Sequence, residues 1–473
     1  MTEPKPMRPK AVLVGVHLPD VSEGEHASSL AELSRLVHTL GYDVVGQVSQ
    51  RRSHLSASAV VGAGKLKDLA LYTDGVGVVP SSAPVKKRRI DREVTEAPDA
   101  PESLDADDAL DPELDDDEEV GEPIRTDGDT ELVAVDHDLT PTQARNLERA
   151  TGATVMDRSA VILEIFHRHA RSREARLQVE IARLNYLAPR LREGVGGDRQ
   201  RGGIGGKGAG ESALELDRRR IRDRVAELRR ELDSISHEHD VRRARRKEQL
   251  RVALVGYTNA GKSSLMRALT GSEVYVADKL FATLDTTVRT LHPPSAPKVL
   301  VSDTVGFIKK LPHDLVASFR STLDEAREAS LLLHVVDGSD PAWPSQHQVT
   351  RTVLEEIHAG DIDTLLVINK ADRIADDELA ALAEAHPDAV LLSAKRPDDV
   401  ARLRELILSR MEAEMDEATV DVPFGKERAL PLIHESCRVI EEAWDERGGH
   451  FRVRALPDVL ARLKAALGGG GGA

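Results

Sequence analysis

Cysteine is almost absent from this chain of 473 residues, which contains only Cys437. A disulfide framework within one chain and a zinc site built from several thiolates are therefore both excluded. Long apolar runs are missing as well, because no stretch approaches the ~20 apolar residues that a membrane-spanning helix needs. No apolar segment follows the polar opening, residues 1–5, so we expect no signal peptide. These absences predict a protein without a membrane span and with a cytoplasmic location.

The formal charge of −16 argues against nucleic-acid binding until its distribution is considered. Residues 91–130 hold 18 acidic and 2 basic residues, whereas residues 171–250 hold 14 acidic and 21 basic residues. The acidic segment is also poor in apolar residues, so it cannot bury enough surface to fold, and we expect a disordered insertion. Both a solvated insertion and a regulatory or partner-binding segment fit this composition.

Residues 1–170 predict an N-terminal α/β domain that the acidic insertion interrupts. Strand-like apolar runs occur at 11–16, 42–46, 75–79 and 131–135. Helical spacing between such runs is typical of βα units. A helix is expected to start at Thr140, because this capping residue is followed by Pro141 and, three residues after the cap, by Gln143. Gly152 is a suitable end for that helix.

Residues 171–248 predict a helical hairpin with a glycine-rich tip. Helical patterns cover residues 159–192 and 211–250, and the glycine-rich residues 194–210 separate them. The basic residues of this tip are Arg199, Arg201 and Lys207. The tip fits either a flexible connector or an arm whose cations approach RNA phosphates.

One segment matches the phosphate-binding pattern G-x-x-x-x-G-K-[ST]. It consists of Gly256, Tyr257, Thr258, Asn259, Ala260, Gly261, Lys262 and Ser263. The apolar run before it indicates a strand and the run after it a helix, which is the context that the motif requires. Glycines let backbone N–H groups surround a polyphosphate, Lys262 can reach the β- and γ-phosphates, and the Ser263 hydroxyl can bind Mg²⁺.

Four further segments follow in the order of a guanine-nucleotide site, within a predicted P-loop GTPase domain at residues 249–418 whose alternating strands and helices indicate a mostly parallel sheet. They are Phe281-Ala282-Thr283-Leu284-Asp285, Asp303-Thr304-Val305-Gly306, Asn369-Lys370-Ala371-Asp372 and Ser393-Ala394-Lys395. Thr283 can add a hydroxyl to Mg²⁺ only while the γ-phosphate is present, which would make its loop a switch; Thr286 and Thr287 compete for this role. Asp303 can hold Mg²⁺ through water, and the Gly306 N–H can sense the γ-phosphate.

Asp372 predicts a preference for GTP over ATP. Its carboxylate can accept two hydrogen bonds from the guanine N1–H and N2–H₂ edge, which adenine does not offer. Lys370 can cover the base, Asn369 can tie this loop to the phosphate loop, and the segment from Ser393 can offer a backbone N–H to the guanine oxygen. The expected ligands are therefore GTP, GDP and Mg²⁺.

With these segments the sequence resembles the HflX family of ribosome-associated GTPases, within the Obg-HflX superfamily. The residues that carry the resemblance are 210–219, 278–287, 303–308 and 311–313. The match covers about residues 13–409 without the acidic insertion. Thr286 stands where family members typically have Pro, and Ser212-Ala213 where they have Thr-Gln.

The resemblance implies a GTPase that binds the large (50S) ribosomal subunit and its rRNA. It further implies a role in splitting stalled or idle ribosomes, in recycling or rescue, for example after heat stress. The N-terminal region with the hairpin tip is implied to reach towards the peptidyl transferase centre, which favours an RNA-binding arm.

Phe307 stands where Ras-like proteins carry a catalytic Gln, and its side chain cannot orient water by hydrogen bonding. We therefore expect slow GTP hydrolysis by the protein alone and acceleration by the ribosome, with no catalytic residue assigned in this chain. Asn259 is either a K⁺ ligand, as in related GTPases, or a residue that only fits the turn.

Residues 419–467 predict a small C-terminal α/β domain whose role the sequence does not indicate, and residues 468–473 a flexible tail. The protein is expected to be monomeric. Two other functions stay open: a GTP-dependent regulatory switch that acts on a protein partner, and an NTP-driven RNA remodelling factor. Asp372 argues against ATP as the main nucleotide of the latter.

Overall fold

The computed structural model describes residues 8–79, 129–191, 213–244, 250–272, 280–281, 287–309 and 320–468. The acidic segment up to residue 128 and the glycine-rich tip lie outside this part, as do Arg199, Arg201 and Lys207, so the ideas about them stay predictions. The chain divides into two compact units, Met1–Val161 and Ile162–Ala473. The finer division of the second unit into hairpin, GTPase and C-terminal domains stays a prediction.

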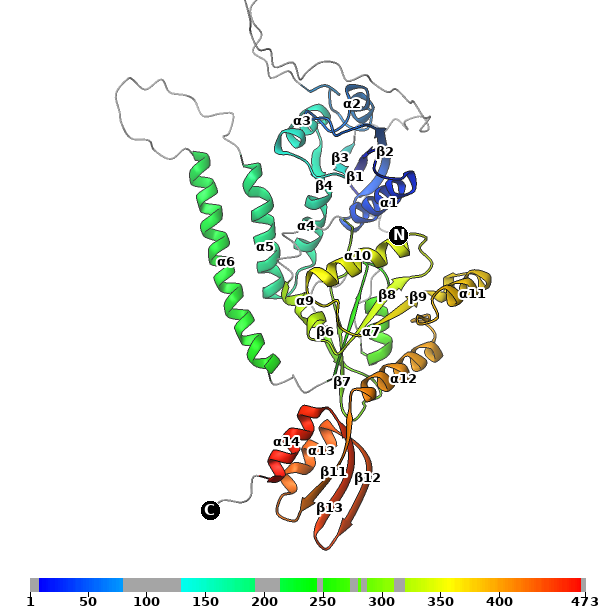
Figure 1. Cartoon of the computed structure of the whole chain (residues 1–473). Helices are drawn as coiled ribbons and strands as arrows, with labels where there is room; N and C mark the ends of the chain where they lie inside the picture. The colour runs from blue at the N-terminus through cyan, green and yellow to red at the C-terminus, as the bar shows by residue number, and fades with distance from the viewer. Residues whose placement is uncertain are drawn as a thin grey trace, which may run out of the picture. The chain divides into compact units, whose positions relative to one another are not determined.

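Strands and helices alternate in the first unit, as the sequence pattern predicts (Figure 1). The elements are β1 (Lys10–His17), α1 (Glu23–Thr39), β2 (Asp43–Arg51), α2 (Ala63–Ala70), β3 (Thr130–Val135), α3 (Pro141–Thr151) and β4 (Thr154–Asp157). The four strands form one parallel sheet in the order β2-β1-β3-β4. Thr140 and Gln143 form the expected capping box at the start of α3, and Gly152 ends the helix with a φ of 69°.

The prediction of a strand at residues 75–79 is wrong. The chain turns there, and the Gly77 N–H donates a hydrogen bond to the Ala150 carbonyl at 2.9 Å. A Cβ at Gly75 would lie 2.2 Å from the same Ala150 oxygen, and Gly77 has a φ of 67°. The alternation of Gly and Val imitates a strand pattern, but the glycines are needed for close packing on the end of α3.

The hairpin of the second unit consists of two helices that lie side by side (Figure 1). These two helices are α5 (Arg173–Leu187), which ends in the short helix η1 (Ala188–Arg190), and α6 (Ala213–Ala244). They are preceded by α4 (Arg158–His169), which crosses the boundary between the two units. The helix expected over residues 159–192 is interrupted, because the Ser172 side chain caps a new helix by accepting a hydrogen bond from the Ala175 N–H. Leu177 and Ile181 of α5 pack against Val225 and Leu228 of α6, which joins the two helices through an apolar seam.

A six-stranded sheet with the order β10-β9-β8-β5-β7-β6 follows, and all its strand pairs are parallel except β6 with β7. Its elements are β5 (Leu250–Gly256), α7 (Lys262–Thr270), β6 (Thr287–Thr290), β7 (Val299–Asp303), α9 (Arg320–Arg327), β8 (Leu331–Asp337), α10 (Trp343–Glu356), β9 (Thr364–Asn369), η2 (Ala371–Arg373), α11 (Asp376–Ala385), β10 (Val390–Leu391) and α12 (Pro397–Ala413). Side chains of α7 and α12 share one apolar core with the sheet, and side chains of α9 and α10 share another. Parallel strands buried on both faces place the loops that follow them at one edge.

The C-terminal part is a three-stranded antiparallel sheet with helices packed on it. Its elements are β11 (Asp416–Pro423), η3 (Glu427–Ala429), α13 (Leu430–Ser436), β12 (Arg438–Asp445), β13 (Gly448–Ala455) and α14 (Pro457–Gly468), and the strand order is β11-β13-β12. Cys437 is fully buried and belongs to the same apolar core as Ile433 and Phe451.

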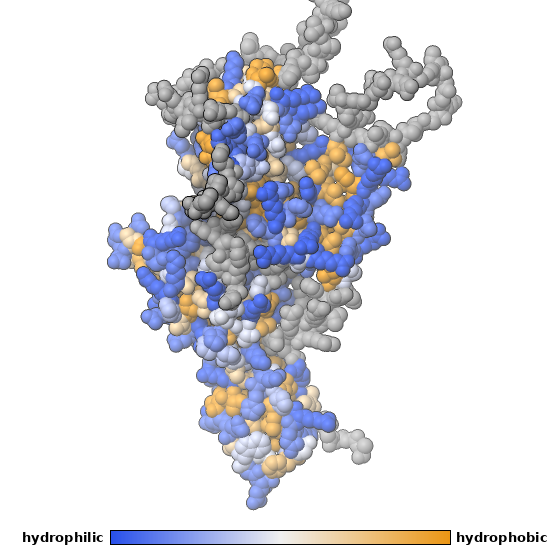
Figure 2. Space-filling model, turned by 180° about the vertical axis from the view of Figure 1, so that it is seen from behind, coloured by the Kyte–Doolittle hydropathy of each residue, from blue (hydrophilic) through white to orange (hydrophobic). Residues whose placement is uncertain are grey.

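Hydrophilic residues cover much of the face drawn in Figure 2, with apolar patches between them. In the described part of the chain, no helix combines the length and the apolar character that crossing a membrane requires.

Candidate nucleotide-binding site

The phosphate loop connects β5 to α7 at the carboxyl edge of the six-stranded sheet. Gly256 and Gly261 adopt φ values of 144° and 97°, which side chains other than glycine rarely adopt. A Cβ would lie 2.1 Å from the Val335 carbonyl oxygen at Gly256 and 2.2 Å from the Asn369 amide nitrogen at Gly261. Both glycines are therefore required by conformation and by contact, and the N-terminus of α7 faces the loop, as anion binding demands.

Lys262 is buried and folds back over the loop. Its ammonium group donates hydrogen bonds to the carbonyl oxygens of Gly256 at 3.0 Å and Tyr257 at 2.8 Å. Burial lowers the pKa of Lys262 to about 8, and the negative charge of Asp303 opposes that shift. A phosphate that approached this amine would favour its charged form further.

Ser263 and Asp303 bring a hydroxyl and a carboxylate oxygen together. The Ser263 hydroxyl donates to the Asp303 carboxylate at 2.7 Å, across 40 residues of sequence. Mg²⁺ prefers oxygen donors and is held in nucleotide enzymes by few protein ligands plus substrate phosphates. The pair fits such an ion, although no group of three or more His, Cys, Asp or Glu side chains among the described residues could hold a metal by itself.

The segment after Asp303 is paired with the phosphate loop through its backbone. The Phe307 N–H donates to the Gly256 carbonyl at 3.1 Å, and the Thr258 N–H donates to the Phe307 carbonyl at 2.8 Å. A Cβ at Gly306 would lie 2.8 Å from the Thr258 Cα and 3.0 Å from the Lys262 amine. The Phe307 side chain is buried in an apolar core that includes Leu323, so it is not placed to orient a water molecule.

Asn369 links the two halves of the site. Its amide nitrogen donates to the Ala260 carbonyl of the phosphate loop at 2.9 Å, and its amide oxygen accepts from the Ala394 N–H at 3.1 Å. The first of these is the tie that the sequence predicts. Because both ends of one buried amide are used, the phosphate loop and the loop after β10 are held in a fixed relation.

Asp372 is held by the same loop. The Ser393 hydroxyl donates to one carboxylate oxygen at 2.6 Å, and the Lys395 ammonium lies 3.4 Å from the other. The hydrogen bond from Ser393 is the largest cause that lowers the pKa of Asp372, with Lys395 contributing as well. The side chain is therefore an ionised acceptor with a set orientation at neutral pH.

Two carboxylates of this region were not predicted from the sequence. Asp337, the last residue of β8, pairs with Lys370 at 2.6 Å, and Asp399 accepts the Ser393 N–H at 2.8 Å. Asp337 could have been predicted, because it stands at the carboxyl end of a parallel strand, and ligands bind at that edge of such a sheet.

The loop of Thr283 is only partly described. Phe281 is buried with a φ of 57°, and its ring meets that of Phe166 edge-on at 4.5 Å between centroids. Ala282, Thr283, Leu284 and Asp285 lie outside the described residues, so their roles stay predictions.

A strand, phosphate loop and helix on a mostly parallel sheet, with Asn369-Lys370-Ala371-Asp372 at the end of β9, define a P-loop GTPase. The protein is accordingly a GTP hydrolase.

Comparisons with known proteins make the assignment more specific. Three family models match: the GTP-binding GTPase N-terminal region over residues 27–79 and 118–167, the GTP-binding GTPase middle region over 169–246, and the 50S ribosome-binding GTPase over 251–370. The chain is 56% identical over 467 residues to GTPase HflX of Gluconacetobacter diazotrophicus, across 98% of this chain and 99% of that protein. It is 42% identical over 347 residues to GTPase HflX of Escherichia coli, across 72% and 81%. The chain belongs to the HflX family of GTPases.

Among solved structures, a GTP-binding protein of Sulfolobus solfataricus in complex with GDP is similar at 21% identity and a TM-score of 0.41, over 84% of this chain and 99% of that one. This match is too loose to add to the assignment.

Proposed function

We propose that this GTPase binds the large ribosomal subunit and uses GTP to separate the subunits of stalled or idle ribosomes. The observation that carries the proposal is a basic groove on the hairpin, in the same chain as a GTPase domain that matches the 50S ribosome-binding family model. rRNA presents a dense array of phosphates, and arginines without acidic partners are suited to bind them.

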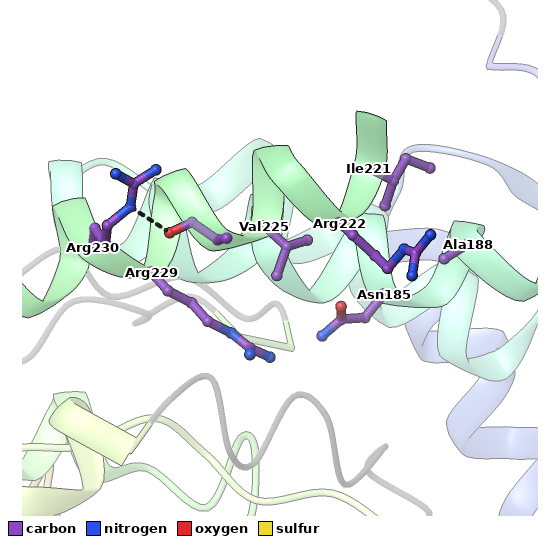
Figure 3. Close-up of a pocket in the computed structure, with 8 residues that line it drawn as sticks. Asn185, Ala188, Ile221, Arg222, Val225, Arg229 and Arg230 are labelled. Carbon is purple, nitrogen blue, oxygen red and sulfur yellow. Dashed lines mark hydrogen bonds between the residues drawn. The ribbon is translucent and has the colours of Figure 1, made fainter. Parts of the chain in front are cut away.

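The groove has a volume of about 580 Å³ and lies between α5 and α6 (Figure 3). Its lining residues are Asn185, Ala188, Ile221, Arg222, Val225, Ala226, Arg229 and Arg230. Among the described residues, no carboxylate pairs with Arg222 or Arg229, whereas Arg224 on the same helix pairs with Glu180 and Glu227. The groove therefore combines an apolar floor with cations that are available to an anionic partner.

The geometry of the site supports the following proposed nucleotide roles. The phosphate loop and Lys262 bind the phosphates, and the orientated carboxylate of Asp372 selects guanine. Ser263 and Asp303 are the described residues that would hold Mg²⁺, with Thr283 as a further candidate ligand; the bound ion would neutralise charge on the phosphates. Phe307 offers no hydrogen bond to water, so this chain by itself should hydrolyse GTP slowly and depend on the ribosome for acceleration.

Co-sedimentation through a sucrose gradient tests the proposal. With a non-hydrolysable GTP analogue, the protein should migrate with 50S subunits, and 50S subunits should raise its rate of GTP hydrolysis. Absence of co-migration would contradict the proposal and favour a GTP-dependent switch with a protein partner.

Charge removal tests the groove. The double variant Arg222→Gln/Arg229→Gln should weaken 50S binding about tenfold. The slope of log binding constant against log salt concentration should also become less steep by roughly two, one for each lost phosphate contact. Arg224→Gln on the same helix is the matched control, because that side chain is already engaged by two glutamates. Equal loss in both variants would show that the groove has no special part in binding.

A further inference from the structure

Tyr257 has a contact that phosphate binding does not explain. The phosphate-loop pattern leaves its position open to any residue, since the bonds to phosphate come from the backbone. Here the Tyr257 side chain is 4% exposed, and its hydroxyl oxygen accepts a hydrogen bond from the Lys309 N–H at 2.7 Å. The bond joins the phosphate loop to a segment 52 residues away in sequence.

This bond extends the backbone pairing between the two segments. Thr304 donates from its hydroxyl to the Leu254 carbonyl at 2.7 Å, and Phe307 exchanges two backbone bonds with Gly256 and Thr258. Lys309 follows two residues after Phe307, so the Tyr257 hydroxyl extends the attachment beyond the last backbone pair. Of these four bonds, it alone depends on a side chain of the phosphate loop.

Gly306 lies between two of the residues that make this attachment, Thr304 and Phe307. A carbon added at Gly306 would lie 2.8 Å from the Thr258 Cα, too close for a side chain, and 3.0 Å from the Lys262 amine. The backbone of Gly306 and the amine that binds phosphate are thus held in contact by bonds on both sides of the glycine. A loosened anchor at Lys309 would let this segment move relative to the phosphates.

We propose that Tyr257 is a positioning residue for GTP hydrolysis: its hydroxyl anchors the backbone at Lys309 and thereby keeps Gly306 in register with the phosphate loop. The inference concerns the GTPase reaction of this chain and does not depend on a ribosomal partner. Since GDP lacks the γ-phosphate that Gly306 would face, the anchor should matter for hydrolysis and little for GDP binding.

The variant Tyr257→Phe keeps the ring and removes the hydroxyl. Single-turnover hydrolysis of bound GTP should slow about 3- to 10-fold, the effect of one neutral hydrogen bond, while GDP affinity stays within about twofold. Tyr72→Phe is the matched control, because Tyr72 is similarly buried at 6% exposure but lies in the first unit. Its rate should equal that of the wild type.

A double-mutant cycle identifies the partner. Lys309→Pro removes the donor N–H, so adding it to Tyr257→Phe should slow hydrolysis no further than Lys309→Pro alone. An unchanged rate in Tyr257→Phe would overturn the proposal. So would a parallel loss of GDP affinity and rate, since that indicates a damaged phosphate loop, and so would full additivity of the two variants.

Discussion

Replacement of Asp372 by Asn should move the base preference of this GTPase from guanine to xanthine. The Asp372 carboxylate is fixed by the Ser393 hydroxyl at 2.6 Å and approached by Lys395 at 3.4 Å, and its pKa is lowered mainly by the bond from Ser393. Asn keeps one oxygen that can accept from Ser393 or from the base. It replaces the other oxygen by an amide NH₂, which repels the amino group of guanine and can donate to the carbonyl that xanthine has there.

The size of the effect follows from the bonds exchanged. Guanine would lose one charge-assisted hydrogen bond and keep a weaker neutral one, a cost of about 2–4 kcal/mol. GTP and GDP affinity should therefore fall about 30- to 1,000-fold. Xanthine nucleotides should bind the variant better than the wild type, since their carbonyl finds a donor.

Competition between a fluorescent nucleotide and GDP or XDP measures both affinities. Ser393→Ala is the control, because it keeps the carboxylate and removes only the bond that orients it; its GDP affinity should fall less than about tenfold and its guanine preference should remain. GDP affinity of Asp372→Asn within threefold of the wild-type value would refute the assignment of the base contact to Asp372.

Three further outcomes are expected. Gly261→Ala should reduce GTP affinity at least about tenfold in equilibrium titrations, because residue 261 needs a φ of 97° and an added Cβ would lie 2.2 Å from the Asn369 amide; wild-type affinity would contradict this. Burial lowers the pKa of His334 from its ordinary value of 6.5 to about 3, so between these two pH values only the unfolded chain takes up this proton. The free energy of unfolding should therefore decrease from pH 6.5 to pH 5 by about 1.6 kcal/mol more in the wild type than in His334→Phe. Denaturant titrations at the two pH values test this expectation. If Asn259 helps to bind K⁺, GTP hydrolysis should be faster in K⁺ than in Na⁺, and equal rates would discard that role.

The parts of the site that obey a short sequence motif could be predicted. The two glycines and Lys262 occur at a fixed spacing after an apolar strand, and a short pattern of this kind can be recognised in a sequence without knowledge of the fold. The bond from Asn369 to the phosphate loop was predictable for the same reason, because both of the segments that it joins are recognisable as short motifs.

Contacts that depend on strand order could not be predicted. Asp337 meets Lys370 only because β8 and β9 are neighbours in the sheet, and the Tyr257 hydroxyl reaches Lys309 only because the intervening chain returns along β7. The strand expected at residues 75–79 failed for a related reason. The packing of Gly75 and Gly77 on α3 is a tertiary contact, and the local alternation of residue types carries no trace of it.

The single buried thiol has a practical consequence. Burial raises the pKa of Cys437 to about 11, so at neutral pH the folded chain offers thiol reagents almost no thiolate. A cysteine introduced at an exposed position of the hairpin would therefore accept a fluorophore selectively, without removal of a native residue, and could report the distance to a labelled 50S subunit, the partner proposed above. In the unmodified chain, the rate at which Cys437 reacts with a thiol reagent would instead measure how often the C-terminal core opens.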